Sequence, residues 1–295
     1  MSIVLTRIII PDAGNDSDNY PRIGYDTVIT EDNVMSDEAA SGFPVSNIGN
    51  PVTHLKWKAE TSAQQSIVIL LDEPVTVDYL GLANHNFGTT GTTVTLQYAT
   101  ALGSPLSGGS PLVGSPIGGS PLATWDDIFV NDVISTDNAY IHEFDEITSQ
   151  AFRIIITPGG GSPFVAPELA VAYLGLILSV PEKKFVGYEP PTLNEQSVIS
   201  TGYSENGSFL GRVIRSEGLE HSVTFNYLSA SWYRENFVPF TVQAKIAPFF
   251  YAWRPLDNPD EVAFMWTTSN PKMNNSRGGG VVGFVSVTID MQGIQ

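Results

Sequence analysis

The side chains best suited to acid–base chemistry or metal binding are few and scattered. The carboxylates occur as adjacent pairs, and adjacent residues of a β-strand face opposite ways, so such a pair rarely forms an acid/base couple. No two histidines have the H-x-x-x-H spacing that places two metal ligands on one helical turn. No metal centre is therefore predicted from the histidines, and no paired-carboxylate site. The residues considered are His54, His85, His142 and His221, and the pairs Asp126-Asp127, Asp145-Glu146 and Asp260-Glu261.

Sequence motifs for nucleophilic catalysis and phosphate binding are also missing. The segment nearest to G-x-S-x-G is Gly202-Tyr203-Ser204-Glu205-Asn206, in which asparagine replaces the second glycine. Gly278-Gly279-Gly280 lacks the Lys-Ser/Thr that completes a phosphate-binding loop. The chain has no cysteine, which excludes thiolate catalysis, cysteine-based zinc sites and disulfides. We predict that the chain is not an enzyme and carries no cofactor.

Two polar segments could nevertheless hold a ligand. Asn84-His85-Asn86 could bind a saccharide through hydrogen bonds, or it could be a turn whose side chains satisfy their own backbone. The run from Asp12 to Asn19 has oxygen-bearing side chains at alternate positions, as calcium prefers, and Asp37 and Glu38 could add ligands. The run lacks the glycine and glutamate of an EF-hand loop, so the alternative is an ordinary polar loop. Structural calcium is the hypothesis that this run suggests.

Large aromatic residues are concentrated in the C-terminal part of the chain. The run Phe249-Phe250-Tyr251 places apolar side chains on both faces of a strand. A second apolar face is either a sandwich interior or an oligomer interface. Tryptophan, tyrosine and arginine are frequent interface anchors. The interface predicted on this basis consists of Phe249, Phe250, Tyr251, Trp253, Arg254 and Trp266.

The charge of the chain is strongly negative and uneven. The formal net charge is −17; residues 1–175 carry 5 basic and 20 acidic side chains, whereas residues 176–295 carry 9 and 11. Such an acidic surface repels phosphate, so we expect no nucleic-acid partner. No window of about 18 apolar residues occurs, and the start has neither a basic region nor an A-x-A site. We therefore expect no membrane span and no signal peptide.

Short β-strands bounded by Gly, Pro, Asn and Asp are the elements that must position these residues. Thr93–Tyr98 alternates as a half-buried strand does, and helical periodicity is nearly absent. Many short strands are typical of sandwiches or barrels, so we predict an all-β chain. The charge shift and Pro181 place a boundary near Val180. The predicted parts are an N-terminal arm (1–25), a first module (26–180) and a second β-rich sandwich or barrel module (181–295).

A low-complexity repeat interrupts the first module. Gly-Ser-Pro recurs every five or six residues between 103 and 121, and each proline is followed by Leu or Ile. Proline cannot donate to a strand ladder and glycine is costly to order, so the repeat is predicted to be an extended loop. It could dock on a neighbouring chain through its Leu and Ile residues, or it could be a plain flexible insertion.

The stretch from residue 26 to residue 175 contains an ordered series of strand and turn segments. They are Ser41-Gly42-Phe43-Pro44-Val45-Ser46-Asn47-Ile48, Trp57, Ile67–Leu71, Val77–Asn86, Thr92–Tyr98, Phe152–Thr157 and Leu169–Gly175. This series resembles a discoidin-type, galactose-binding-like jelly roll. The resemblance implies a jelly-roll β-sandwich, a fold that hosts many functions, so it is weak evidence about a ligand.

The second module contains a different set of segments. They are Ser204–Arg212, Pro248–Pro255, Pro259–Trp266 and a closing strand after Gly278-Gly279-Gly280. Together they resemble minor tail and baseplate proteins of long-tailed bacteriophages, with a role similar to that of distal tail proteins.

This second resemblance implies a structural protein of the virion tail, made in the host cytoplasm. Copies of the chain would form a ring of three or six subunits that joins the tail tube to tip proteins or fibres. The alternative is a carbohydrate-binding module protein, and an outward jelly roll could contact host saccharide in either case.

Overall fold

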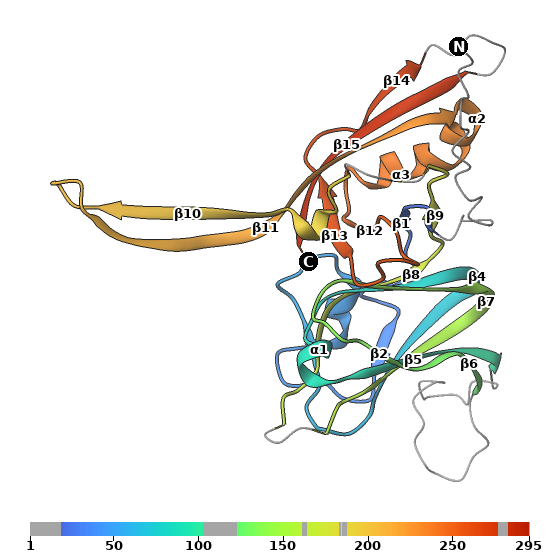
Figure 1. Ribbon diagram of the computed structural model, residues 1–295. Helices are drawn as coiled ribbons and strands as arrows, with labels where there is room; N and C mark the ends of the chain where they lie inside the picture. Colours follow the sequence, from blue (N-terminus) through green and yellow to red (C-terminus); the bar gives the residue numbers. More distant parts are fainter. Residues whose placement is uncertain are drawn as a thin grey trace, which may run out of the picture.

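The computed structural model describes residues 19–102, 123–160, 164–182, 184, 188–276 and 283–294. They form two β-rich modules, which lie one above the other in Figure 1. The Gly-Ser-Pro repeat at 103–121 lies outside the described residues, as does the acidic run before Asn19. Within the described parts of the chain, no helix is long and apolar enough to cross a membrane.

The first module is one antiparallel sheet in the order β3-β8-β4-β7-β5-β6, with β2 paired to β4. Two short helical turns, η2 and α1, lie between its strands. The elements are β2 (Val34–Ser36), η2 (Val45–Gly49), β3 (Trp57–Lys58), β4 (Gln65–His85), α1 (Phe87–Thr90), β5 (Thr93–Leu102), β6 (Ala123–Val133), β7 (Tyr140–Thr157) and β8 (Glu168–Gly175).

The long strands β4 and β7 wrap this sheet around a single core. The first part of β4, Gln65–Leu70, pairs with Ala151–Ile156 of β7, and Tyr79–Leu82 pairs with Tyr140–Glu143. Register shifts between these parts bend both strands. The enclosed side chains are apolar and include the fully buried Trp57. The predicted all-β class and jelly-roll sandwich are confirmed.

The second module is an antiparallel sheet in the order β10-β11-β15-β13-β12-β1-β9, with β14 paired to β15. A short turn, η3 (Pro191–Leu193), precedes it on the β10 side. The strands are β1 (Arg22–Gly24), β9 (Leu178–Ser179), β10 (Glu195–Tyr203), β11 (Phe209–Ser229), β12 (Phe249–Ala252), β13 (Val262–Thr267), β14 (Lys272–Ser276) and β15 (Phe284–Ile294).

The pairing of strands β1 and β9 gives the two modules different bounds from those predicted from the sequence. β1 pairs with β12 on one side and with β9 on the other. Arg22–Gly24, expected within an N-terminal arm, is thus a strand of the second module, and this module resumes at Leu178 rather than after Val180. No local pattern indicates the partner of β1, because Arg22 pairs with Ala252 at the other end of the chain.

A helical segment that the sequence did not indicate covers one face of the second sheet (Figure 1). It consists of α2 (Ala230–Trp232), the π-helical turn η4 (Tyr233–Phe237) and α3 (Val238–Gln243). The Ser229 side chain caps its start by accepting a hydrogen bond from the Trp232 N–H (3.1 Å). Pro239 stands in the first turn of α3, where a missing N–H is tolerated.

The two modules share a third core at their junction. Phe250 and Phe264 of the second module pack there with Tyr79 and Tyr173 of the first. The approach is so close that a Cβ at Gly81 would lie 2.8 Å from the Phe250 ring. Only glycine fits at this position, and the modules are therefore closely packed.

Candidate functional site: a projecting hairpin arm

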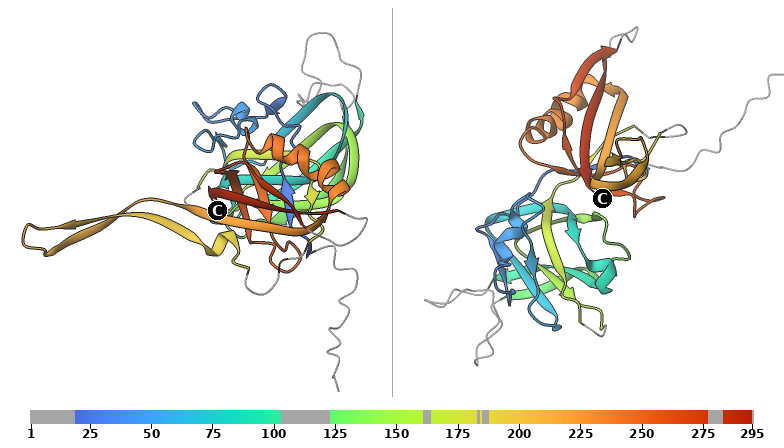
Figure 2. Two further views of the ribbon diagram at one scale, coloured as in Figure 1. Left: turned by 90° about the horizontal axis from the view of Figure 1, so that it is seen from above. Right: turned by 90° about the vertical axis from the view of Figure 1, so that its left-hand side faces the viewer.

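One hairpin leaves the body of the protein and projects away from both modules (Figure 1; Figure 2, left). We call Glu195–Gly218 the arm; it comprises β10 and the first half of β11. The second half, Leu219–Ser229, pairs with β15 inside the second module. Among the described residues, the first half of β11 pairs with β10 alone. The arm is thus a two-stranded extension of the sheet.

A tight turn between Tyr203 and Phe209 closes the tip of the arm. The Ser204 carbonyl accepts a hydrogen bond from the Gly207 N–H (2.9 Å), and its hydroxyl accepts one from the Ser208 N–H (3.0 Å). Gly207 has φ +79°, a left-handed conformation that favours glycine. The strands on either side are rich in valine, isoleucine and threonine, which favour extended backbone.

The alternation of apolar and polar side chains in the second half of β11 continues along the arm, but there the apolar side chains are mostly exposed. In the second half of β11, Val223 and Phe225 are buried. On the arm, side chains of the same kind are mostly exposed. The exposed fractions are Val198 59%, Ile199 40%, Tyr203 65%, Phe209 61%, Leu210 69%, Val213 66% and Ile214 54%.

Strand register gathers part of this apolar surface on one side. Ile199 lies opposite Ile214, and Tyr203 lies opposite Phe209 with their rings 6.4 Å apart. Glu195, at the base, lies opposite the buried Leu219. Residues 195, 199 and 203 alternate along β10, so these pairs share the side that faces the core farther along β11.

A two-stranded hairpin with exposed apolar side chains is unusual on a protein surface. An isolated pair of strands is marginally stable in water, and contiguous exposed apolar residues mark interaction sites. Two exposed arginines add charge: Arg215 donates a hydrogen bond to the Ser200 hydroxyl (3.2 Å), and Arg212 lies near the tip. The arm therefore has the composition of a binding element, with apolar side chains and arginine side by side.

A groove of about 300 Å³ lies where the arm joins the body. Gly218 helps to form it by lacking a side chain, and Trp266 borders it with 38% of its surface exposed. Its other lining residues include Val198, Glu217, Glu220 and Ile294. We call it the root groove.

The structure divides the predicted aromatic interface into two groups. Phe249, Phe250 and Tyr251 are fully buried within the chain, so the second apolar face of β12 is an interior and is not an exposed interface. Phe249 and Tyr251 lie in the core of the second module, and Phe250 faces the jelly roll. This corrects the prediction for these three residues.

The other predicted interface residues lie nearer the surface. Trp253 is partly buried and donates from Nε1 to the Glu261 carboxylate. Arg254 forms an ion pair with Asp257, and Trp266 borders the root groove. Only Trp266 therefore adjoins the arm. The arm itself was not singled out, because its alternation resembles that of a buried strand.

The side chains of the predicted saccharide loop are engaged within the chain. Asn84 donates to the Thr53 carbonyl (2.6 Å), and Asn86 donates to the Ala166 carbonyl (2.9 Å). His85 is 4% exposed, and its Nδ1 accepts a hydrogen bond from the Phe87 N–H (3.3 Å). Only the His85 bond is local to the turn; both asparagines bond to the backbone of distant segments and hold the loop to the rest of the module.

A different part of the jelly roll presents polar and aromatic groups outward. Strand register aligns Met35, Val68, Arg153, Gln97 and Asp127 in one row across β2, β4, β7, β5 and β6. The Arg153 guanidinium donates from Nε to Gln97 (2.8 Å), and Gln97 donates to Asp127 (2.6 Å). We call this row the jelly-roll face.

An aromatic side chain lies over the jelly-roll face. The Trp125 ring is 4.5 Å from the Arg153 guanidinium, in a cation–π contact, and it is only partly buried. Trp125 comes directly after the Gly-Ser-Pro repeat, and no sequence motif marks it.

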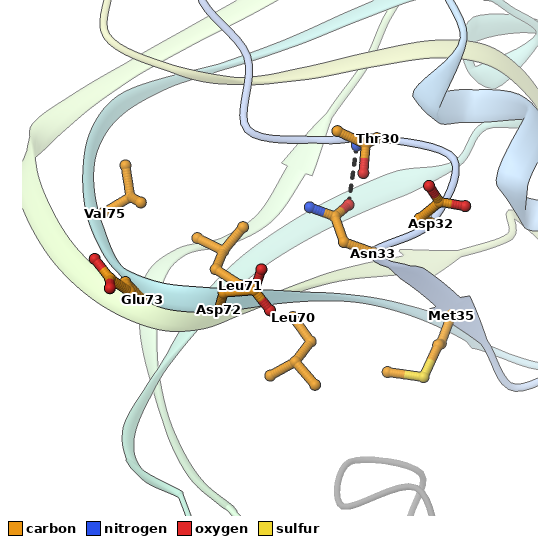
Figure 3. Close-up of a pocket in the computed structure, with 9 residues that line it drawn as sticks. All are labelled: Thr30, Asp32, Asn33, Met35, Leu70, Leu71, Asp72, Glu73 and Val75. Atoms are coloured by element: carbon orange, nitrogen blue, oxygen red, sulfur yellow. Dashed lines mark hydrogen bonds between the residues drawn. The ribbon is translucent and has the colours of Figure 1, made fainter.

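Next to the jelly-roll face is a groove of about 800 Å³, shown in Figure 3. Met35, Leu70 and Leu71 supply apolar surface, while Asp32 and Glu73 lie on opposite sides of the two leucines in this view. Asn33 accepts a hydrogen bond from the Thr30 N–H (2.9 Å), which orders the loop above it. An apolar floor with polar groups at its margin is typical of ligand sites.

The residues suggested for calcium do not form a site in the described part of the chain. Glu38 accepts hydrogen bonds from Thr61 and Gln65, which lower the pKa of its carboxyl. Nowhere among the described residues do three His, Asp or Glu side chains gather to hold a metal ion. The run from Asp12 onwards falls outside those residues, apart from Asn19.

One buried histidine lies on the covered half of β11. His221 is 7% exposed, and its Nε2 lies 2.8 Å from the Tyr188 hydroxyl, which is 2.7 Å from the hydroxyl of Tyr251. Burial, helped by the charge of Lys184, lowers the pKa of His221 to about 4. The imidazole is therefore neutral at pH 7 and belongs to the interior.

Comparison with known proteins gives similar folds for half of the chain. No family model and no curated protein sequence matches it. Among solved structures, chitosan-binding module 1 of a chitosanase/glucanase from Paenibacillus sp. IK-5 is 16% identical, with a TM-score of 0.37 over 50% of this chain and 98% of that one. A pectin-binding carbohydrate-binding module is 13% identical, with a TM-score of 0.34 over 48% and 87%. The CBM32 module of AlyQ is 17% identical, with a TM-score of 0.33 over 51% and 96%.

These similarities describe the fold and leave the function open. At such identities a shared fold does not carry a shared ligand. The tail-tip role implied by the sequence resemblance remains a proposal, as does the prediction that the chain is not an enzyme.

Proposed function

We propose that this chain is a structural subunit that assembles with copies of itself through the arm. Support comes from the arm, where the apolar side chains between Val198 and Arg215 are exposed. Apolar side chains farther along β11 are buried within the chain. Burying a side chain such as Phe209 at a contact would gain about 1.5–3 kcal/mol, and several such residues lie together. Their burial against another copy would stabilise an oligomer.

Within this proposal, the assembly is the tail tip of a long-tailed bacteriophage. The resemblance of Ser204–Trp266 to tail and baseplate proteins supports this more specific role. The chain would be located in the virion tail, in a ring of three or six copies between the tail tube and the tip proteins or fibres.

Removing the arm tests the assembly role. Val198 and Ser216 lie opposite each other, so replacing residues 199–215 by Asn-Gly closes a two-residue hairpin without changing the register. The native chain is expected to form an oligomer, seen as a ring by negative-stain electron microscopy. The shortened chain is expected to be a monomer with an unchanged melting temperature. Mass photometry measures both masses, and a native monomer or a shortened oligomer would contradict the proposal.

A second candidate function is saccharide binding by the jelly roll, which the jelly-roll face supports. Trp125 offers a ring for stacking on a sugar, and Arg153, Gln97 and Asp127 offer donors and acceptors for hydroxyl groups. The neighbouring groove could extend the site toward Leu70.

A glycan array tests this second function. The native chain is expected to retain a saccharide, and Trp125→Ala is expected to weaken its binding at least tenfold. Tyr227→Ala is the matched control, because Tyr227 is an exposed aromatic residue of the other module that lies outside both the arm and the root groove. Equal retention by the native chain and Trp125→Ala, or no retention at all, would exclude the jelly-roll face as a saccharide site.

A further inference from the structure

The outer part of the arm and the root groove differ in charge. Between Ile199 and Arg215 the arm carries Arg212, Arg215 and one acidic residue, Glu205. Three carboxylates lie around the base of the arm, those of Glu195, Glu217 and Glu220, and none of the described residues that line the root groove is basic. The two surfaces have opposite charge within one chain.

The two surfaces also match in their apolar parts. The outer arm presents Tyr203, Phe209 and Leu210, each more than half exposed. The root groove offers Trp266 and Ile294, with an open floor at Gly218. A Cβ at Gly218 would lie 3.3 Å from the Gly293 carbonyl oxygen, so the groove is closely bounded by β15. Aromatic and aliphatic side chains from the tip could fill this space.

The tip cannot reach the root groove of its own chain. The arm is a paired ladder that begins at that groove, and β10 has nine residues. At about 3.3 Å for each residue, the tip lies roughly 25–30 Å from the base. A partner for the groove that carries the same tip must come from another molecule.

We propose that the outer arm of one copy binds in the root groove of a second copy, with Arg212 and Arg215 facing the carboxylates of Glu217 and Glu220. This inference rests on the proposed assembly function and names the surface that receives the arm. The contact joins two different patches, so each copy both donates an arm and accepts one. A head-to-tail contact of this kind produces a ring when its rotation closes.

Charge reversal at each surface tests the pairing. Arg212→Glu with Arg215→Glu makes the arm acidic, and Glu217→Arg with Glu220→Arg makes the root basic. Each double variant alone sets like charges against each other and is expected to be a monomer by mass photometry. Mixing the two in equal amounts restores both attractive contacts in a ring of six, in which the variants alternate, and such a mixture is expected to regain the mass of the native oligomer. A chain with all four changes is expected to assemble alone.

The control, like the chain with all four changes, leaves the net charge unaltered but places the charge reversals away from the arm. Lys245→Glu with Glu235→Arg alters exposed residues in and just after the helical segment, and this variant is expected to assemble as the native chain does. If removal of the arm abolishes assembly but the root variant still assembles, the arm binds elsewhere and this inference is wrong while the assembly function stands. If the arm is dispensable, both are wrong. Failure of the chain with all four changes to assemble, when it remains folded by circular dichroism, would also overturn the pairing.

Discussion

The two halves of β11 carry similar apolar side chains in opposite surroundings. From Leu219 to Ser229 the strand pairs with β15, and its apolar side chains share a core with the helical segment. Phe225 is fully buried there. From Phe209 to Gly218 it pairs with β10 alone, and Phe209 is 61% exposed. Apolar alternation in a strand therefore predicts an apolar face, and it does not by itself predict whether the rest of the same chain covers that face.

The largest expected difference between the two halves of β11 is in the free energy of unfolding that is lost when one phenylalanine of each half is replaced by alanine. Phe225→Ala leaves a cavity among Phe237 and the strands of the core, and it should lower the free energy of unfolding by about 3–5 kcal/mol. Phe209→Ala removes an exposed ring and should change it by less than about 0.5 kcal/mol. Urea unfolding of both variants, at concentrations where the chain is monomeric, measures the difference. Equal losses would mean that the arm is packed within the monomer.

The second prediction concerns the stability of the protein in acid, which depends on the buried histidine of the covered half of β11. The unfolded pKa of His221 is 6.5, and the folded value is about 4, so below pH 6.5 the unfolded chain binds a proton that the folded chain does not. Stability is therefore lost as the pH falls from 6.5 to 4, by up to about 3 kcal/mol from this group. His221→Gln keeps a polar atom near the Tyr188 hydroxyl but cannot be protonated. The loss of stability between pH 7 and pH 4 should be smaller in this variant; an identical loss in both proteins would show that other groups cause it.

A third test concerns the covered surface between the modules. Gly81→Ala places a methyl group against the Phe250 ring, and such overpacking should cost about 1–3 kcal/mol. The control must be a glycine at which a methyl group adds no strain. Gly160 meets this condition, because it has open space and no constraint on φ, whereas Gly42 has φ +87°. Thermal unfolding of Gly81→Ala and Gly160→Ala should therefore differ by several degrees. Similar melting temperatures would indicate that the junction is looser than the structure shows.

The smallest effect is expected at the tip of the arm. Ser204→Ala removes the side-chain hydrogen bond from the Ser208 N–H in an exposed turn, worth about 0.5–1.5 kcal/mol locally. The global free energy of unfolding should not change measurably, because the tip can open without the core. Amide hydrogen exchange should be faster at residues 203–209 and unaltered at 219–229. A lower melting temperature would contradict this separation of the two halves.

Much of the jelly roll could be predicted from local pattern, because its strands alternate and lie between turn residues. Thr93–Tyr98 is an example, and it falls within β5. The helical segment was missed because Pro239 interrupts it, although its buried residues Tyr233, Phe237, Phe240 and Ala244 recur at the spacing of one helix face. The aromatic interface was partly misplaced because burial of Phe250 depends on contact with a separate module.

The arm shows a different limit of sequence reasoning. Ser204–Arg212 belongs to a segment with a family resemblance, yet the exposure of Val213 and Ile214 depends on whether another element packs on the faces of the hairpin. Such packing follows from the arrangement of the whole chain and is not visible in the local pattern. Trp125 and Arg153 were missed for a similar reason, because strand pairing brings them together across 28 positions of sequence.

The pairing of β1 with β12 has a consequence for how the chain folds. Bringing Arg22 beside Ala252 in an unfolded chain would require closing a very long loop, which is slow. The jelly roll removes most of that cost, since it holds its own ends together: the Val28 N–H donates to the Leu174 carbonyl (2.7 Å), and Asp26 lies against Gly175. Once it has folded, β1 and β9 become near neighbours. We therefore expect the first module to fold first and to act as a template on whose ends the second sheet is completed.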